Sequence, residues 1–343
     1  MRLPRFRYWM PKTVKEAVRI KADCGPQSAF VAGGTDLYPN MKRRQQTPQD
    51  VIGLARIPGL ARVRFGSGGL SIGAGVLLSN VESDSRCGRE YPALVHAITE
   101  ISTPLLRNMG TLGGNLLLDT RCNYYDQNYE WRQAIHFCMK KDGEICWVAP
   151  GSPKCLAVQS ADSVPILIAL GARAVLASRD GEREIPVERL YQNDGIHYLT
   201  KRPDELLTEI RVGKSDGWRG AYKKLRRRGS FDFPVLSVGA AVRCDGPTVL
   251  DARLVLGAVA SAPLRLERAE MVLRGRPLDH AAIAEAADAA AGPARPMDNT
   301  DFSFLWRKEM VRRYVAAALR ELQTRGRGDT GTRGPAATDP VRL

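Results

Sequence analysis

Four of the seven cysteines fall within one short stretch of the chain, where their thiols could ligate a metal centre. The four are Cys122, Cys138, Cys146 and Cys155. Their spacing lacks the C-x2-C pairs of zinc ribbons and fingers, and it lacks the C-x2-C-x2-C run of bacterial ferredoxins. From the spacing alone, the four thiols could hold an iron–sulfur cluster, could hold zinc, or could be structural.

Aromatic side chains crowd the same stretch, namely Tyr124, Tyr125, Tyr129, Trp131, Phe137 and Trp147. They could lower the local dielectric and shield a cluster from water, which tunes its potential, or they could simply be core. The adjacent His136 is more often a polar surface residue than a ligand when it stands alone.

Two glycine-rich turns could bind an anion. They are Ala32-Gly33-Gly34-Thr35-Asp36 and Thr111-Leu112-Gly113-Gly114-Asn115. A backbone without Cβ atoms can approach a diphosphate closely, and amide N–H groups where a helix starts can bind it. Neither turn matches the G-x-G-x-x-G fingerprint or the P-loop. One Gly-Gly pair is usually an ordinary turn, whereas two such turns with hydroxyl and amide residues raise the odds of a shared anion.

The first glycine turn follows a predicted strand at residues 29–32 and precedes a short helical turn at 37–41. A capping box at Thr13-Val14-Lys15-Glu16 opens a helix through about residue 22. A second strand is predicted at 51–54. The pattern indicates a small β–α–β unit with the glycines at the strand-to-helix turn.

The rest of the chain divides into a middle and a third region. The middle region has a strand at 70–74, a polar helix at 79–87, a more apolar helix at 92–101, a stretch without clear period at 121–155, and regular structure at 164–170, 174–177 and 205–212. The third region begins near Trp218, with strands at 235–242 and 252–259, an Ala-rich helix at 281–291, and a helix at 305–322. Leu305, Val311, Val315, Ala318, Leu319 and Leu322 form the expected apolar face of that last helix. After Thr324, Gly, Pro, Thr and Arg predict a disordered tail.

Composition narrows the class of protein. The 343 residues are 44% apolar and 26% charged, which is ordinary globular composition. The sequence has no run of about 18 apolar residues and no recognisable signal peptide, so we expect a cytoplasmic protein without a membrane span. An odd number of cysteines argues against a disulfide framework. A net charge of +14 favours an acidic ligand or partner.

The basic charge also leaves a nucleic-acid-binding module as a remote alternative. No helix-turn-helix, RNP or zinc-finger pattern supports it. A run of three arginines at 226–228 is usually a solvated face or a subunit contact.

Three segments carry a resemblance to a known family. Residues 31–37 (VAGGTDL) resemble the first FAD-diphosphate loop of the flavoprotein subunits of the xanthine dehydrogenase and CO dehydrogenase family. Residues 107–115 (RNMGTLGGN) look like their second loop, and LGAVA at 256–260 with PLR at 263–265 is similar to their C-terminal domain. The resemblance covers about residues 4–322. Both loops in this order are far more specific than either one.

One subfamily fits better still. The run DTRCNYY at 119–125, with Cys138, Cys146 and Cys155 following, looks like the insertion of 4-hydroxybenzoyl-CoA reductase β subunits. In that subfamily the inserted loop binds an extra 4Fe–4S cluster, which ordinary xanthine dehydrogenase flavoprotein domains lack. The resemblance therefore implies 4Fe–4S on Cys122, Cys138, Cys146 and Cys155, and FAD on the two glycine loops.

The resemblance also implies the residues around FAD. Ala32, Gly33, Gly34, Thr35, Asp36 and Leu37 would form the first loop, and Thr111, Gly113, Gly114 and Asn115 the second. Ile101 would pack on the cofactor, Asp162 would bind the ribose, Leu207 would lie near the isoalloxazine, and Lys223 would lie near the flavin ring, with Lys224 as a one-residue ambiguity. From the residues alone, Asp162 could instead be a helix cap and Lys223 a solvated charge.

The implied fold is α+β, a PCMH-type FAD-binding fold of two α/β lobes with a C-terminal α+β domain of the CO dehydrogenase flavoprotein type. The expected parts are an N-terminal lobe at 1–55, a second lobe at 56–216 with the insertion at about 119–158, the C-terminal domain at 217–323, and the tail at 324–343. FAD should lie between the first two lobes.

The implied function is electron transfer within a molybdenum hydroxylase-type complex. A separate large subunit would hold molybdopterin, a small one would hold 2Fe–2S clusters, and the assembly would be a heterohexamer (αβγ)2. The implied reaction is reductive dehydroxylation of 4-hydroxybenzoyl-CoA with ferredoxin as donor. The alternatives are an oxidative CO dehydrogenase, xanthine dehydrogenase or aromatic hydroxylase subunit, and a scaffold subunit that has lost its cofactors, which the intact glycine loops oppose.

Overall fold

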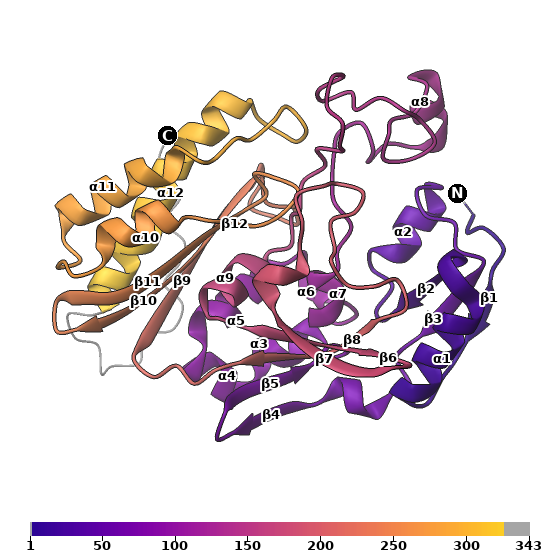
Figure 1. Ribbon diagram of the computed structural model, residues 1–343, viewed down its shortest axis with the longest axis horizontal. Helices are drawn as coiled ribbons and strands as arrows, with labels where there is room; N and C mark the ends of the chain where they lie inside the picture. Colours follow the sequence, from indigo (N-terminus) through magenta and orange to yellow (C-terminus); the bar gives the residue numbers. More distant parts are fainter. Residues whose placement is uncertain (1, 326–343) are drawn as a thin grey trace.

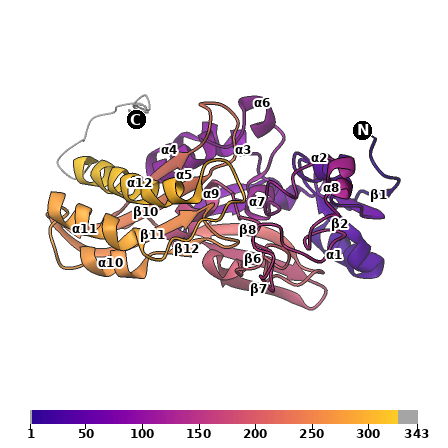
Figure 2. The same cartoon turned by 90° about the horizontal axis from the view of Figure 1, so that it is seen from above.

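Three β-sheets follow one another along the chain, each with its own helices, and together they form an elongated row (Figures 1 and 2). This computed structural model describes residues 2–325. The tail was expected at 324–343, but residues 324 and 325 belong to the last helix. The rest of the expected tail, from 326 on, lies outside the described residues. Mixed helix and sheet content confirms the α+β class.

The first sheet is small and parallel, with strand order β1-β3-β2. Its elements are β1 (Arg7–Trp9), α1 (Val14–Cys24), β2 (Ser28–Val31), α2 (Leu37–Lys42) and β3 (Asp50–Gly53). The Thr13 hydroxyl accepts the amide of Glu16 at 3.1 Å, which caps α1 as its sequence predicts. The first glycine turn leaves the carboxyl end of β2, so its backbone amides are presented at one edge of the sheet.

The second sheet has five antiparallel strands in the order β4-β5-β8-β6-β7. The strands are β4 (Val63–Gly66), β5 (Gly69–Gly73), β6 (Arg173–Ser178), β7 (Gly181–Pro186) and β8 (Leu206–Val212). The helices of this lobe are α3 (Leu78–Ser83), α4 (Ser85–Glu90), α5 (Pro92–Thr99), α6 (Pro104–Arg107), α7 (Leu112–Leu116) and α9 (Ser163–Ala169). One continuous apolar core joins the sheet to these helices.

The predicted helix at 79–87 is divided in two. The Asp84 carboxylate accepts the amides of Arg86 and Cys87, and so caps the new helix α4. An aspartate that bonds to the following backbone interrupts a helix more readily than it continues one.

An irregular segment leaves the second lobe after α7 and returns before α9. It stands clear of the sheets beside the first lobe and contains one short helix, α8 (Tyr129–Ala134) (Figure 1). Its two ends are paired at a neck, because Arg121 and Val158 exchange two backbone hydrogen bonds of 2.8 and 2.7 Å.

The third sheet is antiparallel, with strand order β12-β11-β10-β9. Its elements are β9 (Trp218–Leu225), β10 (Leu236–Asp245), β11 (Thr248–Gly257), β12 (Leu264–Arg265), α10 (Glu267–Leu273), α11 (His280–Ala291) and α12 (Phe304–Arg325). Gly239 of β10 lies so close to α9 that a Cβ there would be 2.3 Å from the Pro165 carbonyl carbon. Leu305 was expected on the apolar face of α12, but it is 68% exposed, because it lies in the first turn before the helix packs on the sheet.

Candidate functional site

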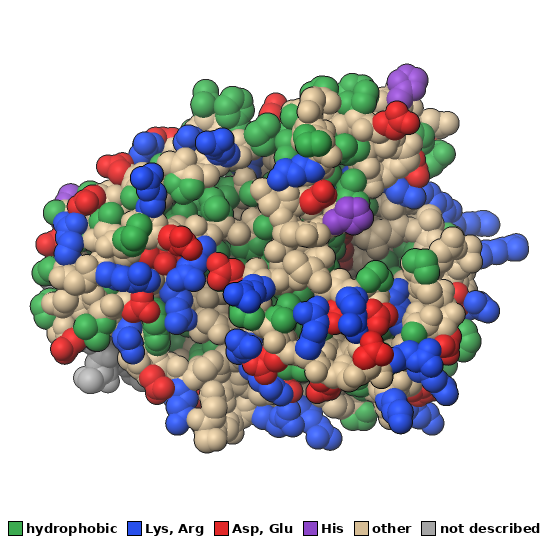
Figure 3. Space-filling view, in the orientation of Figure 1, with side chains coloured by type: hydrophobic (Ala, Val, Ile, Leu, Met, Phe, Trp, Pro, Cys, Tyr) green, Lys and Arg blue, Asp and Glu red, His purple; other side chains and the backbone are tan. Residues whose placement is uncertain are grey.

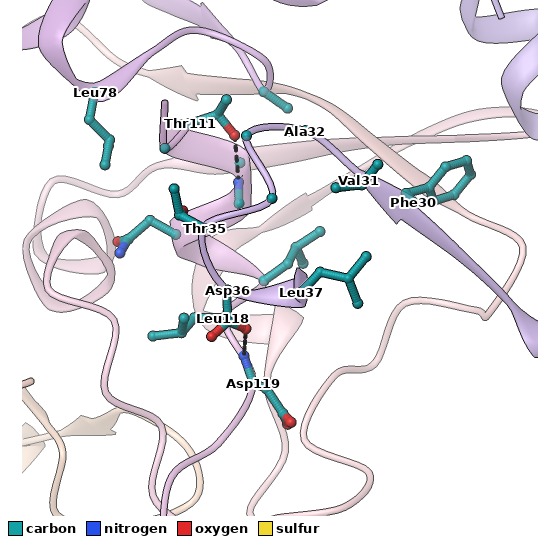
Figure 4. A pocket seen from close by; sticks show the side chains of 18 of the residues that line it. Phe30, Val31, Ala32, Thr35, Asp36, Leu37, Leu78, Thr111, Leu118 and Asp119 are labelled. Atoms are coloured by element: carbon teal, nitrogen blue, oxygen red, sulfur yellow. Dashed lines mark hydrogen bonds between the residues drawn. The ribbon is translucent and has the colours of Figure 1, made fainter. Parts of the chain in front are cut away.

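A cavity of about 580 Å³ lies where the first and second lobes meet. Thirteen of the fourteen residues expected around FAD line it. They are Ala32, Gly33, Gly34, Thr35, Asp36, Leu37, Ile101, Thr111, Gly113, Gly114, Asn115, Asp162 and Leu207. Figure 4 shows residues of both glycine turns side by side in this cavity. Its size is in the range of small-molecule sites.

The two glycine turns touch each other backbone to backbone. A Cβ on Gly33 would be 1.7 Å from the Met109 carbonyl oxygen, and one on Gly110 would be 3.5 Å from the Thr35 hydroxyl. Gly34 has φ of +71°, a left-handed conformation that favours glycine. The turns therefore meet only because neither carries a side chain at the contact.

Side-chain hydrogen bonds hold the second turn in place. The Thr111 hydroxyl accepts the Gly114 amide at 3.0 Å (Figure 4), and the Asn115 side-chain oxygen accepts the Ser163 hydroxyl at 2.6 Å. Gly113 packs on strand β5's end, where a Cβ would be 2.6 Å from that of Ala74. The turn is thus held against the start of α9 at one end and against the end of β5 at the other.

Asp162 joins the cavity wall to the third sheet. Its carboxylate is buried, and it accepts hydrogen bonds from the Tyr222 hydroxyl at 2.7 Å and the Lys224 ammonium at 3.1 Å. Burial raises the pKa of Asp162, and the charge of Lys224 opposes that rise. The carboxylate bonds to β9 side chains rather than to helix α9, so a plain capping role does not describe it.

Lys223 is the expected site residue that the structure places elsewhere. Its ammonium forms an ion pair with Glu321 of α12 at 2.7 Å. Successive side chains of a strand point to opposite faces, so Tyr222 and Lys224 share the face toward Asp162 and Lys223 takes the other. Of the two lysines, Lys224, whose side chain is 1% exposed, is the one that contacts the cavity-lining Asp162.

Several further residues line the cavity. Phe231, Asp232 and Phe233 reach it from the connection between β9 and β10, and Tyr198 and Lys201 reach it from the segment before β8. Burial lowers the pKa of Lys201 to about 8. The sequence signal for the first three was an aromatic pair within a basic loop, but nothing local tied that loop to the glycine turns.

A chain of ion pairs links the first glycine turn to the neck of the irregular segment. Arg121 pairs with Asp36 and, at 3.4 Å, with Asp126, and its guanidinium lies 4.2 Å from the centre of the Phe233 ring. Burial raises the pKa of Asp36, while the charge of Arg121 opposes the rise. The Asp36 carboxylate also accepts the Asp119 amide at 3.5 Å (Figure 4).

Lys140 makes a second link. Its ammonium, on a side chain only 6% exposed, donates to the Asp119 carboxylate at 2.8 Å and to the Thr120 hydroxyl and Gly195 carbonyl at 2.7 Å each. The same ammonium lies 5.6 Å from the ring centre of Tyr198, which lines the cavity. The cavity wall and the cysteine-bearing segment are therefore in direct contact.

The four clustered cysteines are buried free thiols. Cys122, Cys138, Cys146 and Cys155 are each 4–7% exposed. Three of them pack in one small apolar cluster with Tyr125. Burial raises the pKa of Cys122 to about 12 and that of Cys155 to about 11, and neighbouring cysteines of the four add to both shifts. The fold thus gathers the four sulfurs at one place, away from water.

Backbone amides are aimed at the sulfurs. The Ala157 amide donates to the Cys155 sulfur at 3.4 Å, and the amides of Tyr124 and Lys140 bond to Cys122 and Cys138. Each donor follows its cysteine by two residues. Such bonds stabilise negative charge on sulfur and tune cluster potential. A Cβ on Gly195 would be 2.7 Å from the Cys155 sulfur, so the chain closes tightly over this thiol.

These features bear on which metal centre the thiols fit. Within residues 2–325, no group of three or more His, Cys, Asp or Glu side chains could hold a metal ion. A single zinc would need all its thiolates about 2.3 Å from one point. A 4Fe–4S cluster takes each thiolate on a different iron, so four gathered but separate sulfurs fit its donor set.

Lys and Arg side chains are spread among Asp and Glu in Figure 3 rather than gathered in one patch. In the part of the chain that the structure describes, no helix is long and apolar enough to cross a membrane.

Comparison with known proteins gives a consistent result. Residues 4–214 match the model of the FAD binding domain in molybdopterin dehydrogenase, and residues 220–322 match that of the CO dehydrogenase flavoprotein C-terminal domain. The chain is 29% identical to the carbon monoxide dehydrogenase medium chain of Hydrogenophaga pseudoflava, over 92% of this chain and 97% of that one. It is 31% identical to the aldehyde oxidoreductase FAD-binding subunit PaoB of Escherichia coli K12, over 78% and 86%.

A solved structure agrees. The carbon monoxide dehydrogenase of Hydrogenophaga pseudoflava that lacks the Mo-pyranopterin moiety of its cofactor superposes with a TM-score of 0.78, at 29% identity. The match covers 95% of this chain and 99% of that one.

Proposed function

Because the chain belongs to the flavoprotein subunits of the molybdenum hydroxylase family, we propose that it binds FAD in the cavity between its first two lobes and passes electrons between FAD and a 4Fe–4S cluster. The observation that carries the proposal is the direct contact between that cavity and a segment with four buried free thiols. Members of this family are oxidoreductase subunits, and the oxidoreductase assignment extends to this chain.

The two glycine turns would hold the FAD diphosphate. Gly33, Gly34, Gly113 and Gly114 bring no side chain to the surface of the turns, so phosphate oxygens could approach the backbone closely there. The Thr35 hydroxyl stands at the same junction and would add a side-chain donor. Ile101 and Leu207 would supply apolar contacts to the ring systems.

The four thiols would hold one 4Fe–4S cluster. Cys122, Cys138, Cys146 and Cys155 would each ligate one iron, in a pocket that excludes water. The cluster, when bound, supplies one-electron transfer, and FAD supplies one- or two-electron transfer. Lys140 and Tyr198 would form the partition that an electron crosses between the two groups.

The reaction itself would take place on partner subunits. We propose a molybdopterin-binding large subunit, a small subunit with 2Fe–2S clusters, and a heterohexamer (αβγ)2. The finer assignment is the β subunit of 4-hydroxybenzoyl-CoA reductase, with ferredoxin as electron donor. It is supported by the DTRCNYY run and the three further cysteines of the irregular segment.

A second candidate is an oxidative subunit of the CO dehydrogenase or aldehyde oxidoreductase type. It is favoured by the similarity to the carbon monoxide dehydrogenase medium chain over nearly the whole of both chains. The two candidates differ in the direction of electron flow, so the substrate assay separates them.

The test is cofactor analysis of the native complex, purified without oxygen. We expect one FAD per chain and about four irons and four acid-labile sulfides beyond those of partner subunits. The variant Cys146→Ser should lose that iron and keep FAD, because Cys146 does not line the cavity. The matched control is Cys244→Ser, a free cysteine of β10 outside the segment, which should keep both groups.

Substrate assays complete the test. The wild-type complex should dehydroxylate 4-hydroxybenzoyl-CoA with a reduced low-potential donor. Oxidation of CO or of an aldehyde with a dye acceptor, without that activity, would favour the second candidate. Zinc without sulfide in the purified protein would contradict the cluster.

A further inference from the structure

One fully buried arginine in the irregular segment has donors that the fold leaves unused. Arg132 of α8 is 1% exposed. Its Nη2 donates to the Arg43 carbonyl at 2.8 Å. Its Nε and Nη1 find no hydrogen-bond partner among the residues that the structure describes. Unpaired buried donors on a charged group are costly, so this guanidinium is built for a partner that the polypeptide does not provide.

Arg307 shows that this is not how the protein treats buried arginines in general. It is also fully buried, and each of its three nitrogens donates to a carbonyl. Arg107, a third buried arginine, donates to both oxygens of Glu82. The unpaired donors of Arg132 are therefore a local feature of the irregular segment.

The surroundings of Arg132 point to the missing partner. Its guanidinium lies 5.9 Å from the ring centres of both Tyr129 and Phe137, so two aromatic rings are its neighbours. The Phe137 amide donates to the Arg132 carbonyl at 2.6 Å, and the next residue, Cys138, belongs to the cysteine cluster. The guanidinium therefore lies beside the residue that precedes Cys138, and an anionic group bound by the cysteines could accept hydrogen bonds from its unused donors.

We propose that Arg132 donates its free N–H groups to the 4Fe–4S cluster or its thiolate sulfurs and thereby raises the midpoint potential of the cluster. This inference rests on the proposed function. A cluster with four thiolates is an anion whose negative charge grows by one when it accepts an electron from the flavin or from a low-potential ferredoxin-type donor. No bond is made or broken and no proton moves. A fixed buried cation with directed donors stabilises the reduced form more than the oxidised one.

Arg132 and Lys140 would then have different tasks. The charge of Lys140 is matched by Asp119 on the cavity wall. Arg132 has no carboxylate partner within the described residues and reserves its charge for the cluster. It would be a positioning residue that sets potential without ligating iron.

The experiment is a redox titration of the anaerobic native complex, followed by the EPR signal of the reduced cluster. Arg132→Gln removes the charge and keeps amide donors of similar shape. We expect at least a tenfold smaller reduced-to-oxidised ratio at a fixed ambient potential, which is a fall of about 59 mV for a one-electron couple. Arg132→Lys, which retains the charge but loses the guanidinium fork, should fall by less.

Lys141→Met is the matched control. It removes a cation from the same segment, but the Lys141 side chain is 32% exposed and paired with Asp142. The midpoint potential of this variant should therefore change by no more than about a third of the change caused by Arg132→Gln. An unchanged potential in an iron-loaded Arg132→Gln complex would overturn the inference and leave the proposed function standing. If Arg132→Gln loses its iron, Arg132→Lys decides: a lowered potential supports the inference, and a wild-type potential overturns it. A wild-type complex without this cluster would refute the proposed function itself.

Discussion

Replacing Gly33 with alanine should separate the two glycine turns. The new Cβ would stand 1.7 Å from the Met109 carbonyl oxygen and 2.5 Å from its carbon. Ordinary van der Waals contact begins at 3.4 Å, so the two backbones must move apart by about 1.7 Å. Both contacting atoms belong to main chain, so no flexible side chain can absorb the change.

The expected loss follows from that displacement. Amide-to-phosphate hydrogen bonds have N···O distances near 2.9 Å and are lost when stretched beyond about 3.5 Å. If one turn keeps its contacts, about two bonds to a charged group are lost, each worth roughly 1.5–3 kcal/mol. The affinity for FAD should therefore fall by about two to four orders of magnitude. Overpacking should also lower the free energy of unfolding of the apoprotein by about 1–3 kcal/mol.

Two measurements separate the effects. FAD affinity is measured by fluorescence titration of the apoprotein, and stability by urea unfolding without FAD. Gly59→Ala is the control, because a Cβ at Gly59 meets nothing within 4 Å, and it should leave both values near wild type. Wild-type FAD affinity in a folded Gly33→Ala protein would refute the assignment of the two turns to the diphosphate.

Three further predictions concern charged side chains. Burial lowers the pKa of Lys201 to about 8, so between pH 8 and 10.5 the unfolded chain binds a proton that the folded one lacks; apoprotein stability should rise over this window by up to about 3 kcal/mol in urea unfolding, and Lys201→Met should abolish the rise. Arg121→Met leaves the Asp36 carboxylate buried without its cation and should cost about 3–5 kcal/mol at pH 7.5, with a smaller loss at pH 5.5 where protonation relieves the charge; a loss that does not change with pH would contradict this. Burial raises the pKa of Glu205, but the hydrogen bonds and charges of Arg183 and Arg202 together outweigh burial and lower it, so the contribution of Glu205 should be complete above pH 4.5 and vanish as pH falls through the lowered value; Glu205→Gln should therefore flatten the acid limb of the stability curve.

The glycine turns could be predicted from sequence because their signal is local. A strand, two glycines, a hydroxyl and a short helix occur within a few residues, and both turns appear as expected. Strand β1 gave no such signal, because it has three residues and is mostly exposed, and its parallel pairing with β3 joins segments far apart in the chain.

The choice between Lys223 and Lys224 shows a different limit. Strand β9 is covered on both faces, by α5 and α9 on one and by α12 on the other. Ala221 and Tyr222 are both fully buried, so alternation of apolar and polar residues does not reveal which face meets the cavity. Which residues of β9 face the cavity is set by the hydrogen bond between Tyr222 and Asp162, which are 60 positions apart in the sequence. The unpaired donors of Arg132 likewise depend on the packing of the whole segment.

The paired neck of the irregular segment has a consequence for how such a subunit could arise. Arg121 and Val158 lie side by side, so a segment between them can be inserted or removed while the chain on either side of the neck keeps its course in the second lobe. Insertions whose ends meet in space are tolerated by a host fold far better than their length would indicate. A single recombination event at this point could therefore exchange the whole cysteine-bearing segment for a short turn, and related chains with and without it could share every other part of the structure.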